Sequence, residues 1–585
     1  MIPADPADPA FRRDRPLLLL LAAGLLLRLG LAWASFPYLA WRGPLIDDAF
    51  YSFSIARNLA AGSGPTADGI HETSGFQPLY TSLLVPFYLL FPRDPILPIH
   101  MALTLLALCG SLTGWFLYRV VRRVASRRAA VFALALWTFS PYFLTHGENG
   151  LETGLFGLAL AATLDYHLAK GRTLVSTRDS ARLGLLLGLT ILSRVDGLLF
   201  ATAVAYDLMR RPRAPGERLR HLVVASSVAL ATVSPYLLFL ALRFGAILPA
   251  SGSATRFLSL CYGTRFTFGA RSVIYFPPGS VPWTYYLGSL RKAIQALCSE
   301  PLLFPLSPFL CVASLAGFFT PRTLLRVLGG GALLFANLLA LKRPAGAGED
   351  AWKSLVRVGA VSASLWIPAY AFGILGQWWF GRYFFPLFLF MTLFSGPALD
   401  RLGGGLAVFR RLGPARFFAV ALSLHLFLFA LQTPEKLLRH KPYLNISEYL
   451  TAARLLDDVL PPGSRAGAFQ SGTLSYFSRR TVINLDGVVN PAAEKALRDG
   501  KVAPYIRQEG IEAVIDWPWI LEALLVRRSP AGTTGEALGR PRPARSAYCP
   551  ESSGLPGRTH RNIHFPFDFL PQSYVTSAEN NQISR

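Results

Sequence analysis

The chain has 585 residues, of which 52% are hydrophobic and 16% are charged, and its formal net charge is +24. An average soluble domain carries roughly 25% charged residues, so this composition excludes an ordinary soluble protein and predicts a polytopic membrane protein. The basic residues gather in short loops beside apolar runs, as the positive-inside rule requires, which argues against nucleic-acid binding. The five cysteines have no C-x-x-C spacing, so neither a zinc nor an iron–sulfur site is indicated.

The first apolar segment, Leu17 to Ala34, is long enough to cross a bilayer. Arginines precede it and no signal-cleavage site follows, so we expect an uncleaved anchor with a cytoplasmic N-terminus. Asp47 and Asp48 come next. They must lie at the outer surface or in a wet cavity, because two ionised carboxylates are costly in hydrocarbon. A helix is predicted over residues 49–60, so one Asp can also serve as its N-cap.

The first outer loop is expected to extend from Phe36 to Pro95. Within it, the apolar run Pro78 to Phe91 is too short to span the membrane. The next run, Ile96 to Tyr118, ends in arginines that must lie inside, so it travels inward. We therefore expect Pro78–Phe91 to lie along the outer interface.

The next two runs, Ala129 to Thr145 and Leu151 to Leu168, are expected to cross outward and then inward. The turn between them places Glu148 and Glu152 at the outer face.

The apolar stretch Leu183 to Met209 is interrupted by Ser193–Gly197, and both of its flanks are basic. This predicts two short helices that meet at a polar vertex holding Arg194 and Asp196. Broken helices in membranes line a cavity or are buried in protein.

A second outer loop is predicted over residues 244–300, and the number of crossings between 302 and 357 stays open. Later crossings are expected at Leu355–Leu375, Phe384–Leu399 and Phe417–Leu431. With spans of about 20 residues each, the region 1–433 is predicted to be a mainly α-helical membrane domain of about 10 to 13 helices.

From about residue 434 the pattern changes to that of a small α/β domain, placed outside the membrane by the last crossing. It is predicted over 434–528, with a helix in ISEYLTAARLLDDV and strands near Arg465–Phe469, TVINLDG and AVIDWP. The tail, 529–585, is rich in Pro, Arg, Ser and Gly and is expected to be poorly ordered.

Asp47 and Asp48 are the first candidates for chemistry, because a partly buried carboxylate can act as a general base toward an attacking hydroxyl. Helix capping is the alternative. Asp47 is slightly preferred as the base, since Asp48 directly precedes the helix. A divalent cation held by the two Asp residues and His71 is the metal-assisted version of this site, and an ordinary loop position is the alternative for His71.

Arg57 lies on the predicted helix, where it can bind a phosphate or pair with an Asp one or two turns back. Other charged and aromatic residues are candidates for binding a donor or acceptor. Their structural alternatives are a plain loop position, capping, mutual pairing or a membrane-interface belt. These residues are Glu72, Glu148, Glu152, Arg194, Asp196, Arg382 and Tyr383.

The ordered set of motifs resembles the GT-C glycosyltransferases. The likeness is to bacterial transferases that use polyprenyl-phosphate sugars, similar to terminal arabinofuranosyltransferases and dolichyl-phosphate-mannose-type enzymes. It covers about residues 17 to 520. The motifs are DDAFYSFSIARNLAAGSG from Asp47, the T-x-G-x-x-PL turn at Thr73–Leu79, GLET at Gly150–Thr153, SRVDG at Ser193–Gly197, Leu248–Pro249, GRYFFP at Gly381–Pro386 and INLDG at Ile483–Gly487.

This resemblance implies an active cavity at the outer face and an acidic residue after the first span as catalytic base, here Asp47 or Asp48. It also implies a lipid-phosphate-linked sugar as donor. Two positions depart from the family pattern. Arg256 stands where relatives often have a Lys, and this departure concerns the donor-phosphate contact of the second loop. At the vertex of the helix hairpin, Val195 stands where relatives often have Pro.

The sequence thus predicts an inverting glycosyltransferase of the bacterial inner membrane. The expected partners are the bilayer, a polyprenyl-phosphate sugar, and a glycan, lipid or protein acceptor of the cell envelope. A flippase for a lipid-linked glycan and a non-catalytic relative that supports surface assembly are the alternatives. An Asp pair near the bilayer midplane would favour the flippase.

Overall fold

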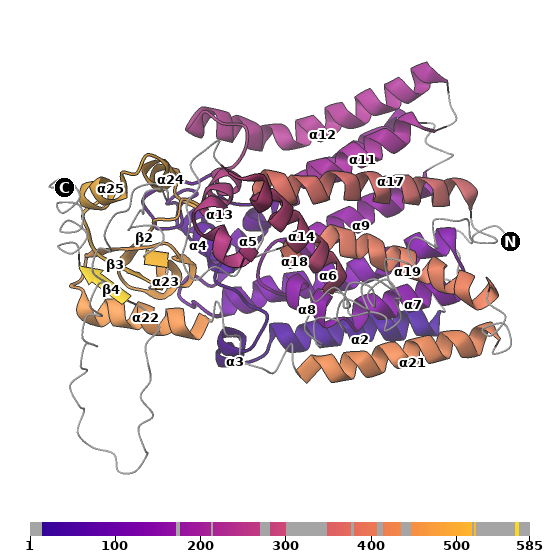
Figure 1. The fold of residues 1–585 in the computed structure, drawn as a ribbon, viewed down its shortest axis with the longest axis horizontal. Helices are drawn as coiled ribbons and strands as arrows, with labels where there is room; N and C mark the ends of the chain where they lie inside the picture. Colours follow the sequence, from indigo (N-terminus) through magenta and orange to yellow (C-terminus); the bar gives the residue numbers. More distant parts are fainter. Residues whose placement is uncertain are drawn as a thin grey trace, which may run out of the picture.

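The computed structural model describes residues 14–170, 176–211, 214–268, 281–299, 348–375, 380–405, 413–434, 446–517, 520–521 and 568–571. In Figure 1 the long helices lie side by side in a bundle, and a small sheet with its own helices lies at one end of that bundle. In the region 302–357, whose number of crossings the sequence leaves open, residues 302–347 lie outside the described residues.

The bundle and its connecting segments are helical almost throughout. In chain order the helices are α2 (Arg15–Ala32), α3 (Phe36–Trp41), α4 (Ala49–Ala60), α5 (Pro78–Leu90), α6 (Leu97–Val124), α7 (Arg127–Thr138), α8 (Pro141–Gly147), α9 (Thr153–Ala169), α10 (Thr177–Ser193), α11 (Gly197–Met209), α12 (Pro215–Phe244), α13 (Ala250–Phe268), α14 (Trp283–Ser299), α17 (Glu349–Pro368) with the π-helix η1 (Ala369–Ile374), α18 (Phe380–Tyr383), α19 (Phe385–Gly405) and α21 (Pro414–Thr433).

Four of these helices are long and apolar enough to cross a membrane: α2, α6, α12, and α17 continued by η1. The bent pair α7 and α8 makes a fifth if it is counted as one span, and α5, α11, α19 and α21 include shorter apolar stretches. These numbers refer only to the described ranges, so the total of about 10 to 13 spans stays a prediction. The chain is a multi-pass membrane protein.

Several boundaries agree with the local sequence signals. Helix α4 covers the predicted residues 49–60, α5 begins at Pro78, and α10 and α11 are separate helices on either side of the SRVDG vertex. The predicted crossing Ala129–Thr145 is formed by two helices, α7 and α8, which meet at 58°. Pro141 begins α8 because its ring cannot continue the preceding helix, and the Ser140 hydroxyl accepts the Phe143 N–H at 3.4 Å as the new N-cap.

The C-terminal domain comprises residues 446–517 together with 568–571. Its sheet has the order β2-β1-β3-β4, in which the first three strands are parallel and β4 is antiparallel. The strands are β1 (Arg465–Ala468), β2 (Thr481–Asn484), β3 (Ile511–Asp516) and β4 (Asp568–Pro571), and the helices are α22 (Ile446–Val459), α23 (Gly472–Phe477), α24 (Pro491–Arg498) and α25 (Val502–Gln508).

The predicted helix and three strands of this domain are confirmed. The expectation that the whole tail 529–585 is poorly ordered is wrong for residues 568–571, which pair with β3. Apolar side chains of the parallel strands, such as Val482 and Ile515, are buried against α22 within the domain. Others, such as Ile483 and Val514, share a cluster with Phe257 of α13. The domain therefore has a core of its own and presents the carboxyl ends of its parallel strands as one edge.

Candidate active site

The two adjacent carboxylates of the first motif point to different partners. The Asp48 carboxylate accepts a hydrogen bond from Arg382 Nη1 at 3.1 Å, and about a quarter of its side chain is exposed. Asp47 is fully buried, and its Oδ1 accepts the Thr473 N–H at 2.7 Å. Asp47 therefore faces the C-terminal domain, and Asp48 faces the helix bundle.

The surroundings of Asp47 raise its pKa. It lies in the loop before α4, where burial raises its pKa to about 6, although the hydrogen bonds from Thr473 act in the opposite direction. Gly472 allows this close approach, because a Cβ at that position would lie 2.3 Å from the Asp47 carbonyl oxygen. Neither Asp caps α4 through its side chain; the residue in the N-cap position, Asp48, makes no such hydrogen bond.

Arg382 belongs to a group of charged and aromatic side chains around the vertex between α10 and α11. Arg194, at the end of α10, pairs with Asp196 at 3.2 Å and lies 3.7 Å from Glu152. The Tyr370 hydroxyl donates to Asp196 Oδ2 at 2.6 Å and accepts from Arg194 Nη2 at 3.2 Å. The sequence alternative of mutual pairing between Arg194 and Asp196 is confirmed, but within a larger network.

Aromatic rings join the two arginines. The rings of Tyr370 and Tyr383 stack at 4.6 Å between centroids. The guanidinium groups of Arg382 and Arg194 lie 5.2 Å and 5.7 Å from the Tyr383 ring. We name this set the vertex cluster, and its members are Asp48, Glu152, Arg194, Asp196, Tyr370, Arg382 and Tyr383.

One donor in the vertex cluster has no acceptor. Arg194 Nη1 is buried and has no hydrogen-bond partner among the described residues. A buried guanidinium N–H without an acceptor is costly, and an anion such as a phosphate would satisfy it. The cluster therefore combines a carboxylate that can take a proton with two arginines that can hold negative charge.

Five other candidates lie outside this cluster. Arg57 donates to the Tyr476 carbonyl at 2.9 Å, near the C-terminal end of α23, and phosphate binding by this residue stays a prediction. Arg256 donates to the Phe372 carbonyl at 2.9 Å and to that of Gly373, at the end of η1. Both arginines donate hydrogen bonds to carbonyl groups that have no partner within their own helix, because they lie at its C-terminal end.

The acidic candidates outside the cluster have structural partners as well. Glu148 pairs with Arg28 of α2 at 3.3 Å, and both side chains are buried. Glu72 pairs with Arg243 near the end of α12. Neither shares a partner with Asp48.

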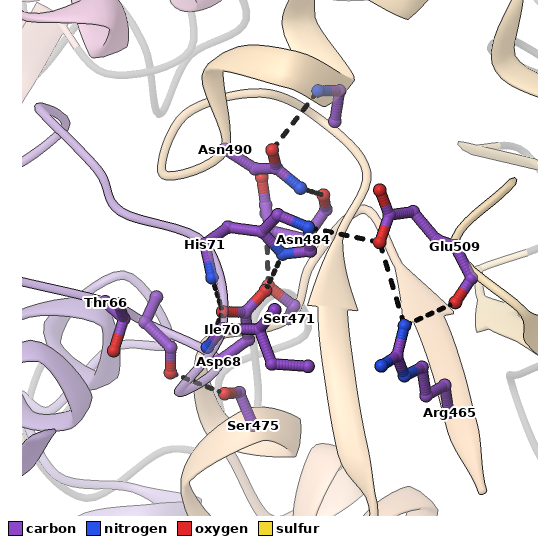
Figure 2. A network of polar contacts seen from close by, with 12 residues as sticks. Thr66, Asp68, Ile70, His71, Arg465, Ser471, Ser475, Asn484, Asn490 and Glu509 are labelled. Carbon is purple, nitrogen blue, oxygen red and sulfur yellow. Dashed lines mark hydrogen bonds and ion pairs between the residues drawn. The ribbon is translucent and has the colours of Figure 1, made fainter. Parts of the chain in front are cut away.

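His71 connects its loop to the C-terminal domain (Figure 2). Its Nδ1 lies 2.7 Å from Asp68 Oδ2, and its Nε2 lies 3.1 Å from Glu509 Oε2. The hydrogen bond to Asp68 raises the pKa of His71, so the two carboxylates favour the imidazolium ion. The metal set Asp47, Asp48 and His71 is not brought together, and no group of three or more His, Cys, Asp or Glu in the described ranges could hold a metal ion.

Comparison with known proteins agrees with this architecture. Residues 98–239 match the family model of dolichyl-phosphate-mannose-protein mannosyltransferases, and residues 441–551 match a domain of unknown function. No curated protein sequence matches the chain. The structure of an Archaeoglobus fulgidus oligosaccharyltransferase in the apo form is 15% identical, with a TM-score of 0.52 over 88% of this chain and 72% of that one.

Two further solved structures are similar. The archaeal oligosaccharyltransferase AglB from Archaeoglobus fulgidus, in complex with an inhibitory peptide and a dolichol-phosphate, has 15% identity and a TM-score of 0.50, over 88% of this chain and 71% of that one. ArnT from Cupriavidus metallidurans, bound to undecaprenyl phosphate, has 18% identity and a TM-score of 0.43, over 88% of this chain and 96% of that one.

The chain has the GT-C glycosyltransferase fold.

Sequence reasoning on this GT-C chain missed three polar residues that organise the site. Tyr370 joins Arg194 to Asp196, and Tyr51 and Asn484 join α4 to the C-terminal domain. Tyr51 carried a signal, because it follows Asp47 by one helical turn and so shares its face. Tyr370 carried none, since it stands in an apolar stretch and gains its role from residues far away in the sequence.

Proposed function

We propose that this chain transfers a sugar from a polyprenyl phosphate to a hydroxyl group of a cell-envelope acceptor, with inversion at the anomeric carbon. The observation that carries the proposal is the ion pair between Asp48 and Arg382, next to Arg194, within a GT-C fold. The matching family is named for a dolichyl-phosphate-linked donor, and AglB was solved with a dolichol-phosphate. Both are lipid phosphates.

Asp48 is the residue we assign as the general base. It takes the proton of the acceptor hydroxyl while the oxygen attacks the anomeric carbon, and the bond from that carbon to the phosphate oxygen breaks. The bond's electron pair leaves with the lipid phosphate. Asp48 suits this role better than Asp47, because Asp47 is fully buried and one of its oxygens is held by the Thr473 N–H.

The two arginines of the vertex cluster are assigned to the leaving phosphate. Arg194 has a buried N–H group that an oxyanion can satisfy, and Arg382 lies beside Asp48. Charge-assisted hydrogen bonds to the departing phosphate become stronger as its negative charge grows, so they stabilise the transition state more than the bound donor. We also keep the proposal that a divalent cation binds the donor phosphate together with these arginines.

The location of the Asp pair supports chemistry on the outer face of the inner membrane. Asp47 contacts α23 of the C-terminal domain, so the pair lies at the end of the bundle that carries this soluble domain, as Figure 1 shows for α4 and α23. This position argues against a flippase, whose binding site would lie near the bilayer midplane. The N-terminus is then cytoplasmic and the C-terminal domain extracytoplasmic.

The proposal is tested with purified protein in lipid nanodiscs, a panel of radiolabelled polyprenyl-phosphate pentoses and hexoses, and a cell-envelope extract as acceptor. We expect Asp48→Asn to lower the transfer rate by about 100-fold or more, the usual effect of losing a general base. The control is Asp458→Asn, which neutralises an exposed carboxylate of α22. Absence of transfer from every donor, or full activity of Asp48→Asn, would contradict the proposal.

A further inference from the structure

Three side chains at the start of the GT-C motif bind the C-terminal domain. Asp47 accepts the Thr473 N–H at 2.7 Å, and Arg57 donates to the Tyr476 carbonyl at 2.9 Å. Between them, the Tyr51 hydroxyl accepts the Ser471 N–H at 3.2 Å and an N–H of the Asn484 amide at 3.4 Å. All of these bonds run from α4 and Asp47, in the loop before it, to α23 and the strand ends beside that helix.

Apolar contacts strengthen the same attachment. Tyr476 of α23 is almost fully buried, and its ring lies 5.3 Å from that of Phe50 and 6.4 Å from that of Phe53. The Tyr476 hydroxyl also donates to the Pro95 carbonyl at 2.8 Å. Helix α23 is therefore part of the core of the segment between α2 and α6.

The surface that receives α4 is the carboxyl edge of the parallel sheet. In open α/β sheets this edge is where ligands bind, in the crevice between strands whose connections run in opposite directions. Here the strand order β2-β1-β3 places that crevice between β1 and β3. Asp516 at the end of β3 accepts the N–H groups of Phe469 and Gln470, both at 2.8 Å, and so shapes the loop after β1 that holds Tyr51.

Asp48 depends on this attachment. It lies between Asp47 and Tyr51, both of which are fixed by the C-terminal domain, while its own side chain turns the opposite way to Arg382. A shift of α23 therefore moves the backbone of Asp48 relative to the vertex cluster. A displacement of about 1 Å at a reacting group can cost about 100-fold in rate.

We propose that the C-terminal domain holds the catalytic carboxylate in place, and that Asp47 and Tyr51 are positioning residues that act through Asp48. At the carboxyl edge of its sheet, helix α4 of the same chain occupies the position where other open α/β sheets bind a ligand. The domain is then an integral part of the active site and does more than bind the acceptor. This inference rests on the proposed function, because it assumes that Asp48 is the base.

The test variant is Tyr51→Phe, which removes a hydroxyl acceptor and keeps the ring. Its control is Tyr505→Phe, because the Tyr505 hydroxyl accepts from Asn490 at 2.9 Å in the same domain but away from α4. We expect Tyr51→Phe to lower kcat by about 10-fold, with little change in the KM for the donor, and Tyr505→Phe to keep kcat. Thermal unfolding of both variants shows whether they are folded.

A double-mutant experiment separates positioning from general destabilisation. In an Asp48→Glu background, which already misplaces the carboxylate, Tyr51→Phe should have less effect on kcat than it has alone, because both changes act on the same group. Asp47→Asn is a second variant with the same expected behaviour. Equal effects of Tyr51→Phe in both backgrounds, or an unchanged kcat, would overturn this inference.

The two proposals fail in different ways. If Asp48→Asn keeps full activity, the proposed function is wrong whatever Tyr51 does. If Asp48→Asn is inactive but Tyr51→Phe behaves like Tyr505→Phe, only the positioning role is wrong.

Discussion

At the scale of single residues, the adjacent carboxylates Asp47 and Asp48 differ because their surroundings differ. Asp47 is enclosed by α23, and its carboxylate holds a backbone N–H. Asp48, one residue later, is partly exposed and paired with an arginine. A partly exposed carboxylate is within reach of an acceptor hydroxyl, as the role of a general base requires, whereas an enclosed one is not.

Arg194 supports a second prediction at this scale. Its planar guanidinium group uses three nitrogens in three ways. Nε pairs with Asp196, Nη2 donates to Tyr370, and the buried Nη1 is left for an anion. Arg194→Lys retains the positive charge but loses the fork, so we expect the transfer rate to fall by about 100-fold.

The measurement is transfer at saturating donor concentration. Arg210→Lys is the control, because Arg210 is an exposed arginine at the end of the same helical hairpin. A full rate in Arg194→Lys would mean that charge alone is sufficient at this position.

At the scale of elements, the carboxyl edge of the sheet carries two buried carboxyl groups. Asp486 follows β2 and Asp516 ends β3. Burial raises the pKa of Asp486 to about 8 and that of Asp516 to about 7, from the usual value of 3.8. Asp486 accepts the N–H of Val488, and Asp516 accepts the N–H groups of Phe469 and Gln470, all in turns at this edge. Polar side chains here order the loops that receive α4.

This edge makes the stability of the domain depend on pH. Because the folded pKa of Asp486 is raised, the folded chain holds a proton that the unfolded chain releases above pH 3.8. Its contribution to the free energy of unfolding therefore falls as pH rises from 3.8 to about 8. Asp486→Asn removes this titration.

We expect the stability of Asp486→Asn, relative to the unchanged protein, to increase with pH across that window and to level off above it. Thermal unfolding of both proteins over a series of pH values measures the difference, and Asp458→Asn is the control for the loss of an exposed acid. A difference that is constant with pH would contradict the raised pKa.

At the scale of the whole molecule, the membrane domain and the C-terminal domain meet along a close contact between backbones. Gly75, in the turn that precedes α5, lies against the turn after β2, and a Cβ on Gly75 would be 1.9 Å from the Val488 carbonyl oxygen. The backbone carbonyl cannot move aside as the end of a flexible side chain can. The two turns approach this closely only because residue 75 is glycine.

Gly75→Ala should therefore separate the two domains locally. We expect faster protease cleavage of the C-terminal domain and about a 10-fold loss of transfer, because the position of Asp48 depends on the attachment of the same domain. Gly30→Ala is the matched control, since nothing lies within 4 Å of a Cβ built at Gly30. Unchanged cleavage and transfer in Gly75→Ala would show that the domains adjust to the added methyl group.

The sequence by itself determined the features that depend on local patterns. Composition showed the membrane class, proline and apolar periodicity marked the limits of α4 and α5, and a polar interruption located the vertex between α10 and α11. The motifs also indicated the GT-C superfamily and named six of the seven residues of the vertex cluster, because those residues stand at helix ends where polar side chains in an apolar chain are conspicuous.

Only the tertiary structure decided what each of these residues does. The partner of Asp47 lies 426 positions away in the sequence, and that of Asp48 lies 334 positions away, so no local pattern could tell the two carboxylates apart. Arg57, Arg256 and His71 have the residue types of a binding site but hold domains and helix ends together. The physical reason is that a side chain's charge state and function are set by the groups around it, and folding brings those groups from distant parts of the chain.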